Sequence, residues 1–254
     1  MNDRYLRQVL VDQIGSEGQQ RLSESSVVVV GTGGLGSPAL TYLAAAGIGY
    51  LGFIDADTVE PSNLNRQFLH NEDDISRYKT KSAKEKLAAL NSDIKIYEYT
   101  GILNEQNAES LLFGYDIVIG AVDSFETRSV INKACASLNI PYIDGGVKGF
   151  SGSIIYSHPP KSPCLNCVFP TKNANKSIMG VLGTTAGVVG TALANIALLI
   201  LLGLENPIKN KLFLYDGLRM NTNLIDIYKD ENCPVCSLNT SIHPGAIKQQ
   251  EETF

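Results

Sequence analysis

The sequence predicts an α/β fold in which a mainly parallel sheet is extended by antiparallel strands. An apolar, valine-rich run at 26–30 ends in glycines, which is typical of a buried parallel strand that turns into a helix. Strand-like and helix-like segments then alternate as far as about Val147, as in a parallel sheet with crossover helices. Beyond Val147, the segments 150–158, 211–217 and 222–229 are interpreted as antiparallel strands.

The composition is that of one globular domain. The chain has 254 residues, of which 44% are hydrophobic and 19% charged, enough for a full core. A net charge of -5 argues against a surface that coats nucleic acid, so we expect no nucleic-acid partner. No basic segment followed by an apolar run opens the chain, and we therefore expect a cytoplasmic protein.

The stretch SVVVVGTGGLG at 26–36 predicts a phosphate-binding turn. Gly31, Gly33 and Gly36 have the G-x-G-x-x-G spacing, and we expect a helix from about Gly34 to Ala46. Glycines allow a close backbone approach, and the helix N-terminus attracts an anion. The expected fold is Rossmann-like, although the motif suits dinucleotides as well as ATP.

Two further predicted strands end in acids. The strand at 50–57 carries Asp55, 24 positions after Gly31, where this architecture binds a ribose hydroxyl. The strand at 116–123 ends in Asp123, for which there are two interpretations. Beside a triphosphate its carboxylate would hold Mg²⁺, or it would cap the helix that begins near Phe125.

Basic residues follow the second strand. Arg66 lies in the loop at 58–70 and Lys79 follows it; both could contribute the charge-assisted contacts that a triphosphate needs. The neighbouring Lys81, Lys84 and Lys86 are interpreted as a solvated helix face. Arg7, in the N-terminal RYLRQ segment, is by default a surface charge.

The segment 184–204 contains 21 residues without a charge, long enough to cross a bilayer. It lacks aromatic belts and has no cluster of lysine or arginine at its ends. We therefore predict a helix in the core or in a dimer interface, and no membrane association.

Four of the five cysteines form two C-x-x-C pairs. Cys164 with Cys167 and Cys233 with Cys236 predict a structural Cys₄ zinc site, with a redox-active pair as the alternative. Such a site would tie the C-terminal segment to the loop that follows Cys164. Cys135 lies in a helical pattern and is interpreted as a small buried apolar residue.

Taken together, RYLRQ, GTGGLG, DADTVEPSNLNRQFLH, Lys79, AVDS and the cysteine pairs resemble the ThiF/MoeB/HesA family, bacterial relatives of ubiquitin-activating enzymes. The resemblance covers about residues 4–236 and implies a homodimer. It also implies roles for individual residues: Gly33, Gly34 and Gly36 at the phosphates, Asp55 on the ribose, Asn63, Arg66 and Lys79 on the triphosphate, Asp123 on Mg²⁺, and Arg7 on the triphosphate in the partner subunit.

The resemblance implies an ATP-dependent adenylyltransferase that activates the C-terminal glycine of a ubiquitin-like sulfur carrier protein ending in Gly-Gly. The product would be an acyl-AMP, with pyrophosphate released. A carboxylate is already a nucleophile at neutral pH, so positioning and charge neutralisation suffice and no histidine is needed as a base. The carrier would be ThiS-like or MoaD-like, from the thiamine or molybdenum cofactor pathway.

These inferences divide the single domain into four parts: a helical arm (1–25), a nucleotide-binding half (26–147), a zinc-tied half for carrier binding and dimerisation (148–240) and a tail (241–254). Unlike some family members, the segment 172–183 has no cysteine, so we expect adenylation only, with sulfur supplied by a separate donor protein. The rival functions are an NAD-dependent oxidoreductase and a non-catalytic module that binds a ubiquitin-like protein.

Overall fold

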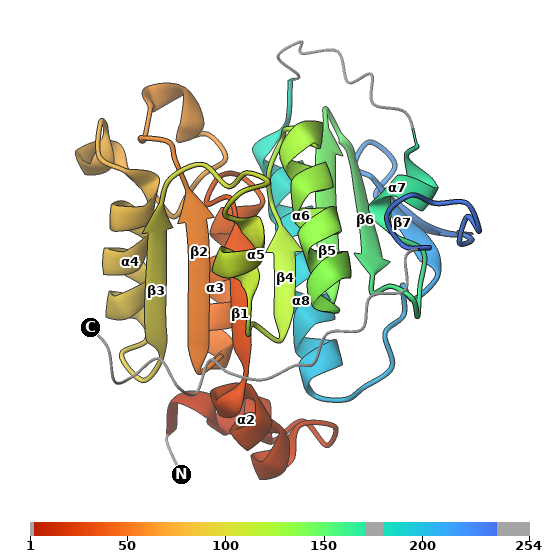
Figure 1. Cartoon of the computed structure of the whole chain (residues 1–254). Helices are drawn as coiled ribbons and strands as arrows, with labels where there is room; N and C mark the ends of the chain where they lie inside the picture. Colours follow the sequence, from red (N-terminus) through yellow and green to blue (C-terminus); the bar gives the residue numbers. More distant parts are fainter. Residues whose placement is uncertain (1–2, 171–179, 238–254) are drawn as a thin grey trace.

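The described residues of the computed structural model, 3–170 and 180–237, form an eight-stranded sheet with helices on both faces (Figure 1). The strand order is β3-β2-β1-β4-β5-β6-β7-β8. Strands β1 to β5 are parallel to one another, and β6, β7 and β8 extend the sheet from β5 with antiparallel pairing. The predicted mixed α/β sheet is confirmed.

The strands are β1 (Ser26–Val30), β2 (Tyr50–Asp55), β3 (Lys95–Thr100), β4 (Ile117–Gly120), β5 (Tyr142–Lys148), β6 (Ser151–Ser157), β7 (Lys211–Asp216) and β8 (Asn221–Asp226). The helices are α1 (Leu6–Val9), α2 (Gly15–Glu24), α3 (Gly36–Ala46), α4 (Lys79–Leu90), α5 (Ala108–Leu112), α6 (Phe125–Leu138), α7 (Leu165–Val168) and α8 (Gly183–Leu201).

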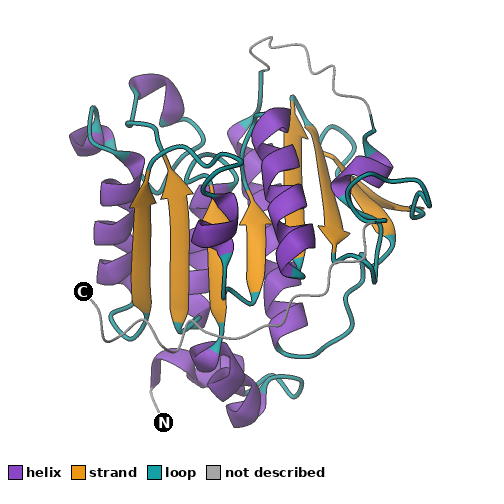
Figure 2. Cartoon of the chain, in the orientation of Figure 1, coloured by secondary structure: helices purple, strands orange, loops and turns teal. Residues whose placement is uncertain are grey.

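Strand β1 lies in the middle of the parallel half, and its valines are buried on both faces. Val27 and Val29 belong to the core beneath α3, α4 and α8, whereas Val28 and Val30 belong to the core beneath α5 and α6. Because successive side chains of a strand point to opposite faces, a continuous apolar run is what such a two-sided position requires. Figure 2 shows the helices on the two sides of the strands.

Two predicted strands end earlier in the structure than in the sequence interpretation. Strand β2 stops at Asp55 and β4 stops at Gly120, so Asp57 and Asp123 lie in the loops beyond them. The first helix after the glycines begins at Gly36, two residues later than expected. These shifts lengthen the loops at the carboxyl edge of the parallel strands.

Helix α8 is the long apolar segment, and by length and hydropathy it could cross a membrane. In the fold it packs on β5 and β6 and beside α3, with eight of its residues buried. Its other side is partly open, as at Val188, which is 40% exposed. The interpretation as a core helix is therefore confirmed for one face of α8.

The N-terminal arm lies at the edge of the sheet opposite the carboxyl ends of the parallel strands (Figure 1). Asn91 donates a 2.8 Å hydrogen bond from Nδ2 to the hydroxyl of Tyr5, and Gln8 donates to the carbonyl of Ala46 at 3.0 Å. Arg7 is exposed on this arm. The arm is thus attached to the ends of α3 and α4.

Gly36→Ala is expected to lower the free energy of unfolding by about 1–3 kcal/mol, the usual cost of overpacking. A Cβ at Gly36 would lie 2.0 Å from the carbonyl oxygen of Gly31, so the turn would have to shift. The matched control is Gly187→Ala in α8, where a Cβ meets no atom within 4 Å. That control should gain about 1 kcal/mol from helix propensity. Urea denaturation of both variants checks this, and equal stabilities would contradict it.

Candidate nucleotide-binding site

The carboxyl ends of β1, β2 and β4 bring three loops together (Figure 1). Gly31 has a φ of 96°, a left-handed conformation that favours glycine. A Cβ on Gly31 would lie 2.5 Å from the carbonyl oxygen of Ala121, so the glycine turn contacts the loop that leads to Asp123. The structure therefore brings the predicted phosphate turn and the predicted Mg²⁺ ligand to one edge of the sheet.

Thr32, in the middle of the glycine turn, is fully buried and held from two sides. Asp55 Oδ2 accepts hydrogen bonds from the backbone N–H of Thr32 at 2.7 Å and from its hydroxyl at 2.9 Å. Asp55 Oδ1 accepts from the N–H of Asp57 at 2.9 Å. A carboxylate offers about four acceptor positions, and three of those of Asp55 are used by these hydrogen bonds.

His70 holds Thr32 from the other side, a role that sequence reasoning missed. Its Nε2 lies 3.2 Å from the carbonyl oxygen of Thr32, and its Nδ1 lies 2.8 Å from the hydroxyl of Ser82. Because a carbonyl can only accept, we assign the proton to Nε2, and Ser82 then donates to Nδ1. Lys86 donates to Ser82 and to Asp74, which extends the chain of hydrogen bonds into α4.

Burial lowers the pKa of His70 below its ordinary value, so the imidazole is neutral at pH 7. It therefore stabilises the turn as a neutral donor, and does not add a cation to the site. The only sequence signal for this role was its position at the end of the loop that carries Arg66.

Arg66 and Gln67 lie against the glycine turn. A Cβ on Gly34 would be 3.4 Å from the side chain of Arg66, and one on Gly33 would be 3.4 Å from the amide nitrogen of Gln67. Arg66 donates from one guanidinium nitrogen to the carbonyl of Ser62, at 2.9 Å. Gln67 is buried, and its Oε1 has no hydrogen-bond partner among the described residues. The turn thus has a cation and an unsatisfied amide beside it.

A polar cavity of about 350 Å³ lies between the loop after β2 and the start of α4. It is lined by Ala56, Asp57, Thr58, Glu60, Asn63 and Lys79. Lys79 is only 6% exposed at its side chain and donates a 2.8 Å hydrogen bond to Asp57, whose side chain is 70% exposed. Lys79 and Asn63 therefore line the same cavity, in which Asp57 is the counter-ion of Lys79.

The other cations near α4 divide into two groups. Lys81 and Lys84 are exposed and both contact Glu98, at 2.6 and 3.4 Å, as expected of a solvated helix face. Lys86 differs from that expectation because it pairs with the buried carboxylate of Asp74. It therefore belongs to the hydrogen-bond chain behind His70.

Asp123 is exposed, and within the described residues its carboxylate makes no hydrogen bond or ion pair. The cap of α6 is Ser124, whose hydroxyl accepts from the N–H of Thr127 at 3.4 Å. The alternative interpretation of Asp123 as the helix cap is therefore wrong, because α6 begins at Phe125 as expected and the residue directly before it, Ser124, is the cap. Arg7 is the one predicted site residue that lies at the opposite edge of the sheet.

The four paired cysteines meet beside α6 and α7. Their Sγ atoms all lie within 4.8 Å of one another, with separations of 3.8 Å (Cys164–Cys167), 3.6 Å (Cys164–Cys233) and 3.4 Å (Cys167–Cys236). Four thiolates at about 2.3 Å from a tetrahedral zinc would be about 3.8 Å apart, so the set could bind a metal. Cys135 lies apart, buried in the core beneath α6 as expected, and burial raises its pKa.

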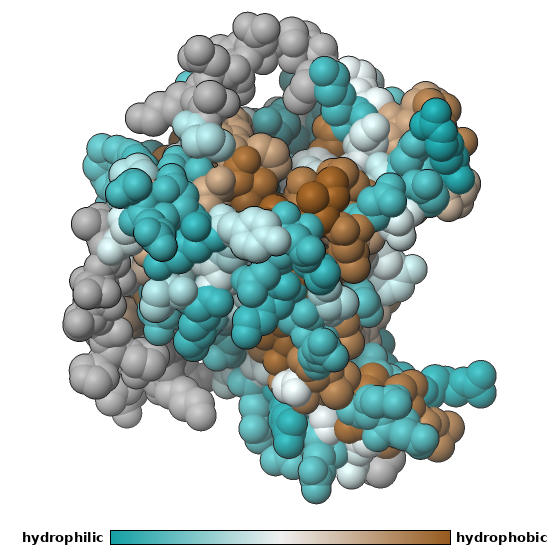
Figure 3. Space-filling model, turned by 90° about the vertical axis from the view of Figure 1, so that its right-hand side faces the viewer, coloured by the Kyte–Doolittle hydropathy of each residue, from teal (hydrophilic) through white to brown (hydrophobic). Residues whose placement is uncertain are grey.

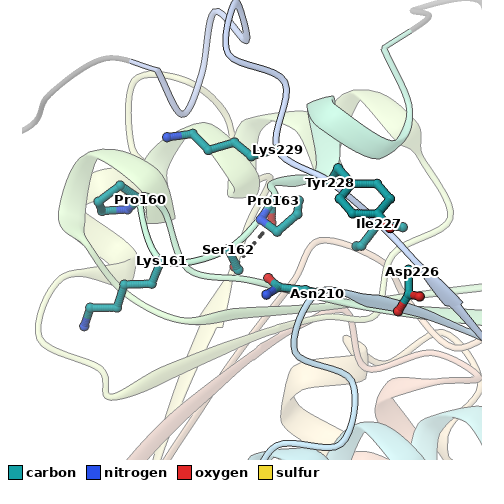
Figure 4. Close-up of a pocket in the computed structure, with 9 residues that line it drawn as sticks. All are labelled: Pro160, Lys161, Ser162, Pro163, Asn210, Asp226, Ile227, Tyr228 and Lys229. Atoms are coloured by element: carbon teal, nitrogen blue, oxygen red, sulfur yellow. Dashed lines mark hydrogen bonds between the residues drawn. The ribbon is translucent and has the colours of Figure 1, made fainter.

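A larger cavity of about 430 Å³ lies where β6 and β8 end and β7 begins (Figure 4). It is formed by residues that follow β6, precede β7, and end or follow β8: Pro160, Lys161, Ser162, Pro163, Asn210, Asp226, Ile227, Tyr228 and Lys229. The end of β6 pairs with the start of β5, at the amino ends of the parallel strands. The glycine turn lies at their carboxyl ends, so the cavity is remote from it. None of the predicted site residues lines it.

Two sequence expectations fall outside the described residues. The tail at 241–254 is one, and most of the segment 172–183, with its missing cysteine, is the other. Gly183 itself is described, and a Cβ there would lie 2.4 Å from the carbonyl oxygen of Asn65. Gly183, the first residue of α8, thus lies beside the loop of Arg66.

A glycine turn with a fixed backbone, two flanking cations and an exposed acid define a nucleotide-binding α/β protein. The described site residues are suited to positioning phosphates and neutralising their charge. The family model for the ThiF family matches residues 5–235, and the chain belongs to that family.

The relatives are adenylyltransferases, and so is this chain. It is 39% identical over 244 residues to the sulfur carrier protein adenylyltransferase of Thermus thermophilus, covering 92% of this chain and 90% of the relative. It is 37% identical over 239 residues to the SAMP-activating enzyme E1 of Haloferax volcanii, covering 92% and 88%. It is also 39% identical to the adenylyltransferase and sulfurtransferase MOCS3 of Arabidopsis thaliana, of which it spans about half (54%) while 96% of this chain is covered.

Among solved structures, the fold matches E. coli MccB with ATP at a TM-score of 0.83 and 25% identity. The match covers 93% of this chain and 75% of MccB. MccB with the peptide MccA-N7isoASN matches at a TM-score of 0.84, covering 93% of this chain and 74% of MccB. The mixed sheet is therefore that of the ThiF fold.

His70→Gln is expected to flatten the pH dependence of stability. The pKa of His70 is lowered in the folded state, so below about pH 6.5 the unfolded chain binds more protons than the folded chain. The free energy of unfolding therefore decreases as the pH decreases. Glutamine does not titrate, so its variant should lose less stability than the wild type between about pH 7.5 and 5. Urea denaturation across that range measures both slopes. His158, whose pKa burial also lowers, stays in both proteins as a common background. Parallel curves would contradict this role for His70.

Proposed function

We propose that this adenylyltransferase activates the C-terminal glycine carboxylate of a small ubiquitin-like sulfur carrier protein that ends in Gly-Gly, of the ThiS or MoaD kind. The observation that carries the proposal is the cluster of Gly33, Gly34, Arg66, Asn63 and Lys79 around one turn and one polar cavity. The relatives from Thermus thermophilus and Haloferax volcanii, a sulfur carrier protein adenylyltransferase and a SAMP-activating enzyme, support a carrier protein as the substrate that receives the adenylyl group.

In the proposed reaction, the carboxylate oxygen of the carrier attacks the α-phosphorus of ATP. The bond between the α-phosphorus and the bridging oxygen breaks, and the electron pair leaves with pyrophosphate. No proton has to be removed from the nucleophile, so the site needs cations and positioning more than a base. In this scheme Gly31, Gly33, Gly34 and Gly36 form the turn that receives the phosphates, and Arg66 and Lys79 balance their charge.

Lys79 would change partners when ATP binds. Its present counter-ion, Asp57, is mostly exposed and can return to water, whereas the ammonium is buried and needs a negative partner. A phosphate oxygen provides that partner. Asp55, fixed by Thr32 and Asp57, would use its remaining acceptor position for the ribose.

Two metals fit the residues present. Asp123, an exposed carboxylate without a described protein partner, would hold Mg²⁺, which neutralises phosphate charge when bound. The four cysteines would hold a structural Zn²⁺, because their sulfur separations are close to those of a tetrahedral thiolate site. With four protein ligands, such a zinc has no open position for catalysis.

A homodimer is proposed from Arg7 and α8. Arg7 lies on the arm at the far edge from the glycine turn of its own chain, so it could act on a triphosphate only in another subunit. The partly open face of α8 would supply apolar surface for the interface.

The carrier would contact the antiparallel half of the sheet. Large apolar side chains are exposed in and near β8, among them Leu218, Met220, Leu224 and Ile225. Figure 3, which views the molecule from this side, shows hydrophobic surface between hydrophilic regions. Apolar surface of this kind suits a protein partner. Sulfur would come from a separate donor protein.

The first test is ATP–pyrophosphate exchange with Mg²⁺ and a panel of small carriers ending in Gly-Gly. Exchange should depend on one carrier and fall by about 100-fold or more in Lys79→Met, because a buried phosphate partner is lost. The matched control is Lys81→Met, which removes an exposed ammonium paired with Glu98 on the same helix and should retain wild-type exchange.

Exchange that survives in Lys79→Met would contradict the role given to this lysine. Absence of exchange with every carrier, from a protein that binds ATP, would favour a different acyl substrate or the non-catalytic module. Tight NADH binding without ATP binding would favour the oxidoreductase, which the comparisons do not support.

Mixing two inactive variants tests whether Arg7 acts in the nucleotide site of the partner subunit. Arg7→Ala and Lys79→Met should each be inactive alone, yet a mixed dimer contains one site with both residues intact. After subunit exchange, about half of the dimers are mixed and one of their two sites works, so about a quarter of the wild-type exchange activity should return. If Arg7 acted within its own chain, no activity would be recovered.

A further inference from the structure

Arg128 is a buried cation that the proposed reaction does not use. It lies in the first turns of α6, and its side chain is 16% exposed. Its Nε is 2.9 and 3.1 Å from the two carboxylate oxygens of Asp144, and a second guanidinium nitrogen also contacts Oδ2. Asp144 is 1% exposed and also accepts a 2.5 Å hydrogen bond from the hydroxyl of Tyr142. The carboxylate is therefore held by two side chains.

The pair stands directly behind the loop of Asp123. Asp144 lies in register with Gly120, the last residue of β4, after which the chain enters that loop. The loop ends at Ser124, the cap of α6, and Arg128 donates its backbone N–H to the carbonyl of Ser124 at 3.1 Å. The Asp123 loop begins at the end of β4, which pairs with β5, and it ends at the first turn of α6. The ion pair between Asp144 on β5 and Arg128 on α6 therefore connects the two ends of this loop.

Two aromatic rings enclose the guanidinium. Its central carbon lies 5.8 Å from the ring of Phe125 and 6.0 Å from the ring of Phe169. Phe125 is two residues after Asp123. Phe169 follows α7, two residues after Cys167. The Arg128 side chain therefore lies beside the first residue of α6, which directly follows the Asp123 loop, and beside the segment that leaves the first cysteine pair.

Asn132, one turn further along α6, makes a second connection to the cysteines. It is 2% exposed, and its Oδ1 accepts the backbone N–H of Leu165 at 3.0 Å. Residues four apart lie on one face of a helix. One face of α6 therefore connects the cysteine cluster to the carboxyl edge of the parallel strands.

We infer that Arg128 is a positioning residue for adenylation: it fixes the Asp123 loop against β5 and against Phe169. This inference rests on the proposed function. A buried ion pair can often be replaced by apolar residues without lowering the free energy of unfolding. Folding stability alone therefore does not explain why an arginine is present here. A planar fork that also contacts two rings is a property of arginine that lysine lacks.

Two variants separate positioning from stability. Arg128→Lys keeps the charge but loses the fork, and the double variant Arg128→Met with Asp144→Leu removes both charges from the buried site. The control is Lys133→Met, on the same helix, where an exposed ammonium pairs with Glu105 at 2.8 Å. Unfolding in urea is measured for all of them.

The functional measurements are the Mg²⁺ dependence of exchange and calorimetric ATP binding with and without Mg²⁺. Both Arg128 variants should fold, raise the half-saturating Mg²⁺ about ten-fold or more, and leave the KM for the carrier unchanged, since misplacement by about 1 Å can cost 100-fold. ATP binding without Mg²⁺ should change less than about two-fold, and Lys133→Met should match the wild type.

Several results would overturn the inference. One is a folded Arg128 variant with the wild-type Mg²⁺ requirement. Others are an equal loss of ATP binding with and without Mg²⁺, or unfolding of both variants, which would show a structural role only. If the wild type exchanges with no carrier, the proposed function fails, while the effect of Mg²⁺ on ATP binding still tests Arg128.

Discussion

The hydrogen bonds to Thr32 are the interaction on which the nucleotide edge depends. Asp55 at the end of β2 holds its N–H and hydroxyl, and His70 from the following loop holds its carbonyl. With all three polar groups of one fully buried residue engaged, the peptide plane that carries the N–H of Gly33 is held in one orientation. A phosphate therefore meets a turn that is already ordered, and less of its binding energy is lost in ordering the loop.

Two cations near this edge have opposite electrostatic situations. Lys79 is buried but its partner Asp57 is mostly in water, so that pair can open toward a new anion at little cost to the carboxylate. Arg128 is paired with Asp144, which is almost fully buried. Burial alone would lower the pKa of Arg128, and the hydrogen bonds and charge of Asp144 instead raise it. The Lys79–Asp57 pair can therefore be replaced by a pair between Lys79 and a phosphate, whereas the Arg128–Asp144 pair is expected to stay intact.

The sequence predicted the mixed sheet, the glycine turn and the grouping of the cysteines because each depends on local residue type and spacing. It placed Asp57 and Asp123 inside strands, whereas both lie beyond them, since apolar runs do not mark where sheet pairing stops. It missed His70 and Arg128, whose roles come from contacts with Thr32 and Asp144, 38 and 16 positions away. Contacts over such separations depend on the fold as a whole. The assignments of Arg66, Lys79 and Asp123 to ATP stay predictions.

The cysteine cluster also has a consequence for the order of events during synthesis. Cys233 and Cys236 follow Cys167 by more than 60 residues, and α8, β7 and β8 lie between them. At about 5–20 residues per second, the second pair leaves the ribosome several seconds after the first. The parallel half can fold while Cys164 and Cys167 still await their partners. During that interval the nascent chain carries two adjacent thiols without the second pair, the form in which they are open to wrong metals or oxidation.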